Sequence, residues 1–320
     1  MKMIQQAALI FLSFLSMFTF AATDLSDKKL LYVDSYHADY VWSEGIEQGM
    51  RQVLESTGIE IKVIRMDTKR NREEAFKLQA GLDVKALIDS YQPDVVIASD
   101  DSASKYVIQP YYKDADIPFV FCGVNWDASV YGFPYKNVTG MVEISLLQPL
   151  LKQLSRYAKG TRLGILSMDA YSEKRAISIY KEQFQIQFDK EVYVNSFAEW
   201  KAAYIKLQDQ VDQLLLVTPQ NMQGWDTYLA AEFVLEHTQI PTGTTQKSMM
   251  PFTTIGLVKI PQEQGEWAAQ AALKILAGQA PNDIPIEKNK RGKLLINLKI
   301  SNSIGLIFHN AILKNAEIIR

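Results

Sequence analysis

The sequence contains very little cysteine and histidine, and it has no large excess of charge of either sign. One cysteine and three histidines among 320 residues allow no internal disulfide and leave few ways to build a metal site. The 34 Lys and Arg residues are balanced by 36 Asp and Glu, whereas nucleic-acid-binding surfaces are usually basic. Hydrophobic residues make up 48% of the chain and charged residues 22%, as in ordinary globular proteins. We therefore expect a globular protein with no metal, no other cofactor and no nucleic-acid partner.

Common catalytic motifs are also missing. The chain has no glycine-rich phosphate loop, no G-x-S-x-G elbow and no H-E-x-x-H pair, and its histidines lie far apart at positions 37, 237 and 309. Asp100 and Asp101 are adjacent carboxylates, but neighbours on one turn point in different directions, and no further acid is spaced to complete a catalytic pair. The sequence therefore favours a binding protein over an enzyme.

The only long apolar stretch lies at the start of the chain. Residues 7–20 are apolar apart from three hydroxyl-bearing residues, follow Lys2, and are followed by small residues. An uncleaved membrane anchor is the alternative, but the stretch is shorter than the roughly 20 residues that a spanning helix needs. We predict that residues 1–22 are a secretory signal peptide, so that the mature protein is soluble and periplasmic.

From Lys29 onward, short apolar runs alternate with helical patterns, and the alternation occurs twice. The first series predicts strands at 30–34, 59–66, 94–98, 117–124 and 138–142, with helices at 43–54, 71–91 and 102–111. The second series, after a linking helix at 148–157, predicts strands at 162–167, 191–194, 213–218 and from 240, with helices at 172–188, 198–210 and 225–237. Such alternation predicts α/β architecture, with two doubly wound parallel sheets that carry helices on both faces.

The last seventy or so residues are too few to form a third domain. They contain an amphipathic helix at 262–277 and a strand at 294–298, which we expect to return to the two units. This predicts an N-terminal lobe of residues 24–145 plus 256–282 and a C-terminal lobe of residues 146–255 plus 283–320. No Gly/Ser-rich linker separates them, so we expect crossover segments that act as a hinge, with a cleft between the lobes.

Candidate ligand contacts follow the strands, because ligands of parallel α/β sheets lie at the carboxyl ends of the strands. In the first unit these positions hold Ser35, Tyr36, His37, Tyr40, Trp42, Asp100, Asp101, Ser102, Asn125, Trp126 and Glu143. In the second unit they hold Asp169, Tyr171, Gln220, Asn221, Trp225 and Thr244.

These residue types indicate a ligand with a cationic and an apolar part. The carboxylates would hold an amino group, and the aromatic rings would contact an aromatic or apolar group. Each residue has a plainer interpretation as well: a helix cap for the turn residues, an exposed loop position for His37, and packing for the aromatic rings. Of the adjacent acids we favour Asp101 as the ligand contact, because it lies nearer the predicted start of the helix.

Four stretches together resemble one known family. They are 98–104 (ASDDSAS), 117–125 (IPFVFCGVN), 266–278 (EWAAQAALKILAG), and 284–287 with 296–306 (IPIE and INLKISNSIGL). In this order they resemble the substrate-binding proteins of ABC transporters that are typified by tryptophan- and tyrosine-binding lipoproteins, which have the type I periplasmic binding protein fold. The chain departs from the usual pattern in lacking a lipid-anchoring cysteine after residue 22 and in the aromatic-rich segment 35–43.

The resemblance implies a monomeric solute-binding protein that closes on a small organic ligand, such as an amino acid or aromatic amine. Its partner would be the membrane permease of an ABC importer. The alternative is a sensory protein that reports ligand binding to a membrane sensor kinase or a cyclic-dinucleotide enzyme. These two readings differ in the partner and not in the fold.

Overall fold

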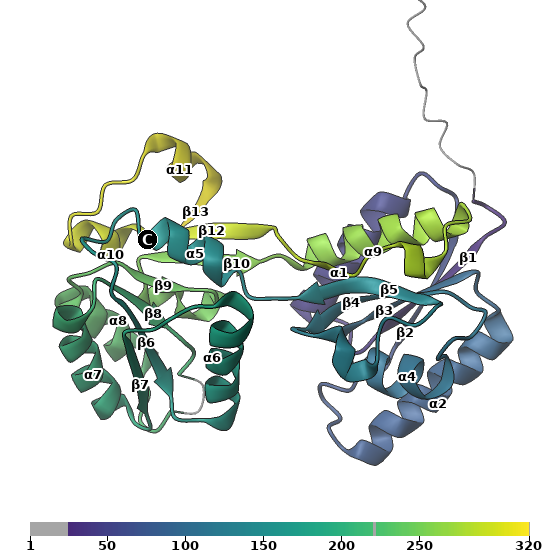
Figure 1. Cartoon of the computed structure of the whole chain (residues 1–320), viewed down its shortest axis with the longest axis horizontal. Helices are drawn as coiled ribbons and strands as arrows, with labels where there is room; N and C mark the ends of the chain where they lie inside the picture. Colours follow the sequence, from purple (N-terminus) through teal and green to yellow (C-terminus); the bar gives the residue numbers. More distant parts are fainter. Residues whose placement is uncertain (1–24, 220–221, 320) are drawn as a thin grey trace, which may run out of the picture.

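The computed structural model describes residues 25–219 and 222–319, which form two α/β units side by side (Figure 1). The strands form two sheets, in the orders β11-β5-β4-β3-β1-β2 and β13-β12-β10-β9-β8-β6-β7. Two predominantly parallel sheets with interleaved helices confirm the predicted fold class. The signal peptide predicted for residues 1–22 lies outside the described residues.

The first sheet is parallel throughout. Its strands are β1 (Lys29–Asp34), β2 (Glu60–Arg65), β3 (Val95–Ser99), β4 (Phe119–Asn125), β5 (Val138–Glu143) and β11 (Glu287–Lys288). On one face lie α1 (Val41–Leu54) and α9 (Pro261–Leu276); on the other lie α2 (Glu74–Tyr91), α3 (Asp100–Ala103), a π-helical turn (Ser104–Ile108) and α4 (Gln109–Tyr111).

The second sheet is parallel except where β12 runs antiparallel to β10. Its strands are β6 (Leu163–Met168), β7 (Lys190–Val194), β8 (Gln213–Leu216), β9 (Thr242–Thr244), β10 (Ile255–Lys259), β12 (Gly292–Asn297) and β13 (Ala316–Ile319). One face packs on α7 (Phe197–Gln210), α8 (Thr227–His237) and α10 (Leu298–Ser303), and the other on α5 (Leu147–Leu154), α6 (Tyr171–Phe184) and α11 (Asn310–Asn315).

The strands are apolar on both sides because helices cover both faces of each sheet. In β1, Leu31 and Val33 belong to the core beneath α2, whereas Leu30 and Tyr32 belong to the core beneath α1 and α9. All four side chains are fully buried. Continuous apolar strands are what a parallel sheet covered on both faces requires, and this is why the sequence pattern identified them.

The strand pairings differ from the predicted division of the chain at two places. Residues 256–259 were expected in the first unit, but β10 pairs with β9 and β12 in the second sheet. Residues 287–288 were expected in the second unit, but β11 pairs with β5 in the first sheet. The prediction placed no strand between the one that begins at residue 240 and the helix at 262–277, and so it missed β10. That helix, α9, packs its Trp267 and Leu273 on the first unit.

Helix α9 packs closely on α1 at glycine positions. A Cβ atom on Gly265 would overlap the carbonyl oxygen of Ile46, and one on Gly49 would overlap the backbone of Gln262. This close approach holds α9, the helix that directly follows β10, against the first sheet. The absence of a side chain at Gly265 therefore allows the two helices to pack closely, although glycine has a low helix propensity.

Replacing Gly265 with alanine is expected to lower the free energy of unfolding by about 1–3 kcal/mol, because the added methyl group forces the helices apart. Helix propensity alone would give the opposite sign, a gain of about 1 kcal/mol. Urea unfolding of this variant and of Gln270→Ala, at an exposed position of the same helix, measures the difference. A stabilised Gly265→Ala protein would show that the helices are loosely packed here.

Candidate ligand-binding site

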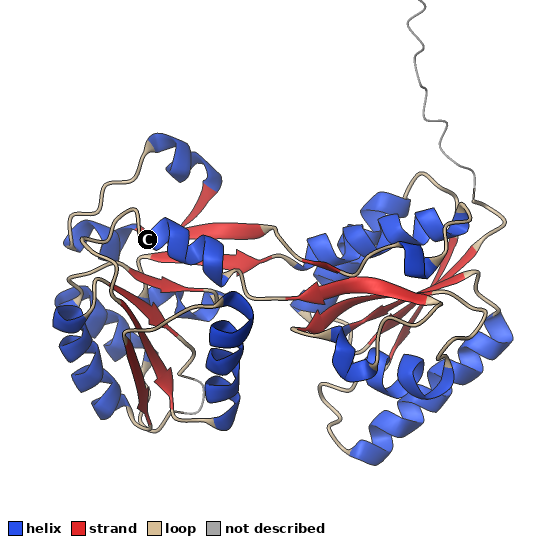
Figure 2. Cartoon of the chain, viewed as in Figure 1, coloured by secondary structure: helices blue, strands red, loops and turns tan. Residues whose placement is uncertain are grey.

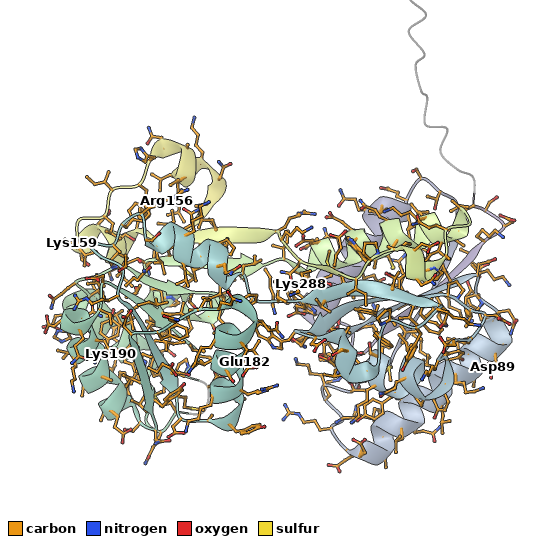
Figure 3. All side chains as sticks on the ribbon, viewed as in Figure 1. Asp89, Arg156, Lys159, Glu182, Lys190 and Lys288 are labelled. Atoms are coloured by element: carbon orange, nitrogen blue, oxygen red, sulfur yellow. The ribbon has the colours of Figure 1, made fainter. Side chains whose placement is uncertain are left out.

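The carboxyl edge of the first sheet brings several polar residues together. Because the strands are parallel, the ends of β1, β3, β4 and β5 meet at this edge, where Asp34, Asp100, Asn125 and Glu143 lie. Three crossover segments, residues 144–146, 260 and 289–291, join the two units, and the first of them begins at this edge, directly after Glu143. In Figure 2 these segments pass through the narrow region between the two sheets, and in Figure 3 Lys288 of β11 lies in that region while Asp89 lies on the far side of the first unit.

Asp100 has the least satisfied side chain of this group. It is 2% exposed, and its Oδ2 atom has no hydrogen-bond partner among the described residues. Burial raises its pKa well above the usual carboxyl range, and the negative charges of Glu143 and Asp34 raise it further. The nearby indole N–H of Trp42 opposes this shift, although that nitrogen also lacks a hydrogen-bond partner. A buried carboxylate with a free lone pair is well placed to receive a donor from a ligand.

The backbone at Asp100 is held in a left-handed conformation. Its φ is 69°, which is uncommon for a residue other than glycine. Opposite it, Gly123 has a φ of 72°, and a Cβ atom there would lie 3.0 Å from Asp100 Oδ1. The turn after β3 and the bulged strand β4 thus fit together closely, and this fit keeps the Asp100 side chain in the interior. Strained backbone of this kind gathers at binding sites.

Asp101, in contrast, is fully engaged within the protein. Its Oδ2 accepts from the amide Nδ2 of Asn125 at 2.6 Å, and its Oδ1 accepts from the hydroxyl of Tyr131 at 2.7 Å. Helix α3 begins at Asp100, two residues before the predicted start, so the reason for favouring Asp101 over its neighbour is wrong. Ser102 lies inside this helix and accepts a hydrogen bond from Thr68. Of the two adjacent acids, Asp100 is therefore the one with an open acceptor. Asp34 Oδ2 also has no hydrogen-bond partner among the described residues, but it lies 3.5 Å from the Arg65 guanidinium.

Glu143 connects the two units. It ends β5 with its side chain 8% exposed and forms an ion pair with Lys259, which ends β10 of the second sheet. Burial raises the pKa of Glu143, while the positive charges of Lys259 and Lys69 pull it down. The pair joins the first crossover segment to the second, and it neutralises one of the carboxylates at the edge.

Aromatic rings from the loop after β1 lie beside these acids. Tyr36 and Tyr40 meet edge to face with their ring centres 5.1 Å apart. Burial raises the pKa of the Tyr36 hydroxyl, and the carboxylates of Asp100 and Asp101 raise it further, so this hydroxyl lies in their field. The Lys259 ammonium lies 5.4 Å from the centre of the Trp42 ring. The predicted pairing of aromatic and acidic groups is therefore present within the first unit.

Three neighbouring residues of this loop have structural roles. The hydroxyl of Ser35 donates to the carbonyl of Ser99 and accepts from the N–H of Ala103, which joins β1 to the turn after β3. His37 is half-buried, with its Nδ1 atom 3.8 Å from Asp67. Ser43 lies just beyond the loop: the helix predicted to begin there begins at Val41, and the Ser43 hydroxyl donates to Asp34.

A cavity of about 390 Å³ opens beside Trp42. Residues of both units line it, together with the crossover between them: Tyr40, Val41, Trp42, Lys247, Val258, Lys259, Ile260, Pro261, Lys293 and Leu295. Its walls are mainly apolar, with lysines from the second unit and the crossover. This is enough space for part of a small organic ligand next to the acidic edge.

The predicted residues of the second unit are more scattered. Trp225 packs in an aromatic cluster, 5.2 Å from the ring centres of Phe197, Trp200 and Phe252. Thr244 is fully buried in β9. At the start of α6, Asp169 pairs with Lys174 at 2.6 Å, and Tyr171 is 86% exposed.

Two predicted residues, Gln220 and Asn221, lie outside the described residues. Trp126 of the first unit lies against α6 of the second, with its ring centre 5.7 Å from that of Tyr180 and 6.4 Å from that of Phe184. The contacts therefore group the predicted residues of the first unit into one site, and Trp126 reaches from it to the second unit.

Four residues of the site were missed by the sequence prediction. Tyr131 donates to Asp101, the side-chain Oε1 of Gln264 accepts from the Gly123 N–H, and Lys69 and Lys259 act on Glu143. The strand-end rule would have found Lys69, which follows β2, and Lys259, if β10 had been recognised. Tyr131 and Gln264 carry no such signal, because the one lies in a 3-10 turn and the other on a helix far along the chain.

Within residues 25–219 and 222–319, no group of three or more His, Cys, Asp and Glu side chains is placed to hold a metal ion. Over the same residues, no helix has both the length and the apolar character that crossing a bilayer requires.

Solved structures with the same fold include several binding proteins. The ligand-free, open structure of a substrate-binding protein with adhesive properties from Clostridium difficile has a TM-score of 0.70, at 16% identity over 92% of this chain and 99% of that one. A domain from Streptococcus pneumonia in complex with L-Trp has a TM-score of 0.54, at 15% identity over 91% and 99%. A periplasmic ribose ABC transporter protein from Conexibacter woesei has a TM-score of 0.55, at 14% identity over 92% and 99%.

The fold is thus that of the type I periplasmic binding proteins. No curated protein matches the chain in sequence. The family model for ABC transporter substrate-binding proteins, however, matches residues 43–319, which include both sheets except for β1. The two similar α/β units and the candidate site at the edge where they join agree with this match. The chain therefore belongs to the family of ABC transporter substrate-binding proteins.

Proposed function

We propose that this chain is an exported solute-binding protein whose ligand is a small organic molecule with an amino group and an aromatic or apolar part. The observation that carries the proposal is the buried Asp100 carboxylate near the Trp42 indole, whose Oδ2 atom has no hydrogen-bond partner within residues 25–219 and 222–319. An ammonium group of a ligand would satisfy this oxygen with a charge-assisted hydrogen bond, which is about twice as strong as a neutral one.

The charge around Asp100 supports a cationic ligand over an anionic one. Asp34, Asp101 and Glu143 all act on Asp100 and raise its pKa, so the edge already holds more negative charge than its surroundings neutralise. An anion placed there would add to this repulsion, and a neutral sugar would leave it unchanged. The Trp42 ring and the apolar walls of the cavity beside it supply the surface for the rest of the ligand, while the rings of Tyr36 and Tyr40 lie beside the acids, where the ammonium group would bind.

Ligand binding would close the two units on each other. We propose lobes of residues 25–143 with 261–288 and of residues 147–259 with 292–319, joined by the three crossover segments between them. A hinge motion needs only a few such residues to change conformation. The ligand stabilises the closed form by contacts that only this form provides, and the membrane permease of an ABC importer would receive the closed monomer.

The ligand class has to come from the site because the neighbouring structures bind different compounds. One is described with L-Trp, another as a ribose transporter and a third with bound allitol. Thermal unfolding with L-tryptophan, L-tyrosine, tryptamine, ribose, glucose and phosphate tests the proposal. A true ligand at 100 times its Kd stabilises the folded protein by about 2.7 kcal/mol. We expect at least one amine to raise the Tm; a rise with a sugar or phosphate and with no amine would refute this ligand class.

A sensory role is the second candidate because the aromatic-rich segment 35–43 departs from the usual pattern of the transport proteins that the chain resembles. In that case the closed form would contact a sensor kinase or a cyclic-dinucleotide enzyme. The neighbouring genes distinguish the two: permease and ATPase genes favour import, and a sensor gene favours signalling.

A further inference from the structure

Lys69 has an unusual position in the site. It belongs to the loop after β2, and its ammonium nitrogen lies 4.7 Å from the centre of the Tyr36 ring and 4.5 Å from that of the Tyr40 ring. Its positive charge also lowers the pKa of Glu143. Lys69 is an exposed residue. Among the described residues it contacts these two rings and forms no ion pair. A cation therefore already occupies the aromatic face beside the carboxylates.

Lys259 repeats this arrangement from the other side. Its ammonium group lies over the Trp42 ring and pairs with Glu143. The two lysines differ in how firmly they are held. Lys259 forms an ion pair with a buried carboxylate, whereas among the described residues Lys69 contacts only the faces of the two tyrosine rings. A cation–π contact at an exposed site contributes about 0.5–1 kcal/mol. Of the two cations, Lys69 is the one that a ligand can displace at little cost.

We propose that Lys69 is a tethered cation that occupies the ligand's cation subsite on Tyr36 and Tyr40 and is displaced by the ammonium group of the ligand. This inference rests on the proposed function and adds a residue that sets its specificity. In the ligand-free protein Lys69 neutralises part of the acidic edge. A ligand must compete with it, so small inorganic cations are excluded, and only a cation that also uses the aromatic surface or Asp100 binds.

Removing the Lys69 charge tests this directly. We expect Lys69→Met to bind tryptamine about 5- to 10-fold more tightly than the wild type in titration calorimetry, because the competing cation is gone. Lys62→Met is the matched control. Lys62 lies 4.8 Å from the Tyr91 ring on the outer strand β2, so this variant loses the same charge and the same kind of contact outside the site, and its affinity should stay within about twofold.

Two further measurements separate displacement from other effects. Indole-3-propionate has the same ring as tryptamine but a carboxylate in place of the amine, and its binding should not improve in Lys69→Met. In wild-type protein, the ε-methylene proton resonances of Lys69, shifted upfield by the two tyrosine rings, should return to the values of a free lysine when tryptamine binds.

Each other outcome has a definite meaning. If tryptamine binds wild type and Lys69→Met equally, or the Lys69 resonances do not move, Lys69 is not a competitor, and the inference fails while the proposed function stands. If Lys69→Met loses tryptamine affinity, Lys69 is a direct ligand contact, and the inference is wrong. If tryptamine and the amino acids bind none of the three proteins, the amine ligand itself is wrong, and the inference fails with it.

Discussion

Replacing Asp100 with asparagine is expected to weaken the binding of an amine ligand by about 30- to 1000-fold, while the protein stays folded. Loss of a charge-assisted hydrogen bond in a closed site costs about 2–4 kcal/mol. Asparagine tolerates the left-handed backbone at this position, so no new strain arises. Titration calorimetry with the best amine from the thermal-unfolding series measures the loss.

Asp101→Asn is the matched control for this experiment. Its carboxylate is already bonded to Asn125 and Tyr131, so it has less to offer a ligand, and its substitution should change affinity much less than that of Asp100. The opposite ranking would mean that the ligand displaces one of these internal partners. Unchanged affinity in both variants would place the amine elsewhere, with Glu143 or Asp169.

The same variant should alter how stability depends on pH. The pKa of Asp100 is raised in the folded protein, so its contribution to stability is fully present below the unfolded carboxyl pKa of about 4 and is lost as the pH rises through the folded value. Asparagine does not ionise and avoids this loss. We therefore expect the stability of Asp100→Asn to rise relative to that of the wild type in urea unfolding as the pH increases from about 4.5 to 7.5. A difference that stays constant would mean that folding does not raise the pKa of Asp100.

The sequence predicted the sheets well because burial on both faces leaves a signal in every strand. Residues 95–98 and 119–122 are fully buried apolar runs, and the turns between elements are marked by glycine, proline and polar residues. The strands at the end of the chain were harder. β10 has only five residues, one of them a glycine, and β13 has only four. Their assignment therefore depends on pairing with β9 and β12, which no local pattern reports.

The candidate site was predicted in part for a similar reason. Strand ends are local features, so Asp100, Asn125 and Glu143 could be found from the sequence. Side-chain direction is not local: Asp100 and Asp101 are neighbours, yet one faces the interior and the other bonds across to β4 and the following turn. The aromatic residue Trp225 has the composition of a ligand contact, but it packs with three other rings, which only the tertiary structure determines.

Replacing Lys259 with methionine is expected to lower the free energy of unfolding by about 2–4 kcal/mol. The Glu143 side chain is 8% exposed, so losing its cation leaves a buried carboxylate that water cannot reach. The methionine side chain keeps most of the apolar length of lysine, so the packing against Trp42 is largely preserved. Urea unfolding at pH 7 measures the loss.

Two companion variants show whether the loss comes from the stranded charge. Lys174→Met breaks the exposed pair with Asp169 and should cost at most about 1 kcal/mol, because surface ion pairs contribute little. The double variant Lys259→Met with Glu143→Gln removes both charges and should recover most of the stability, since replacing a whole buried pair is often nearly neutral. If the double variant is as unstable as Lys259→Met alone, the lysine stabilises the crossover through the contact of its ammonium group with the Trp42 ring and not through the charge of Glu143.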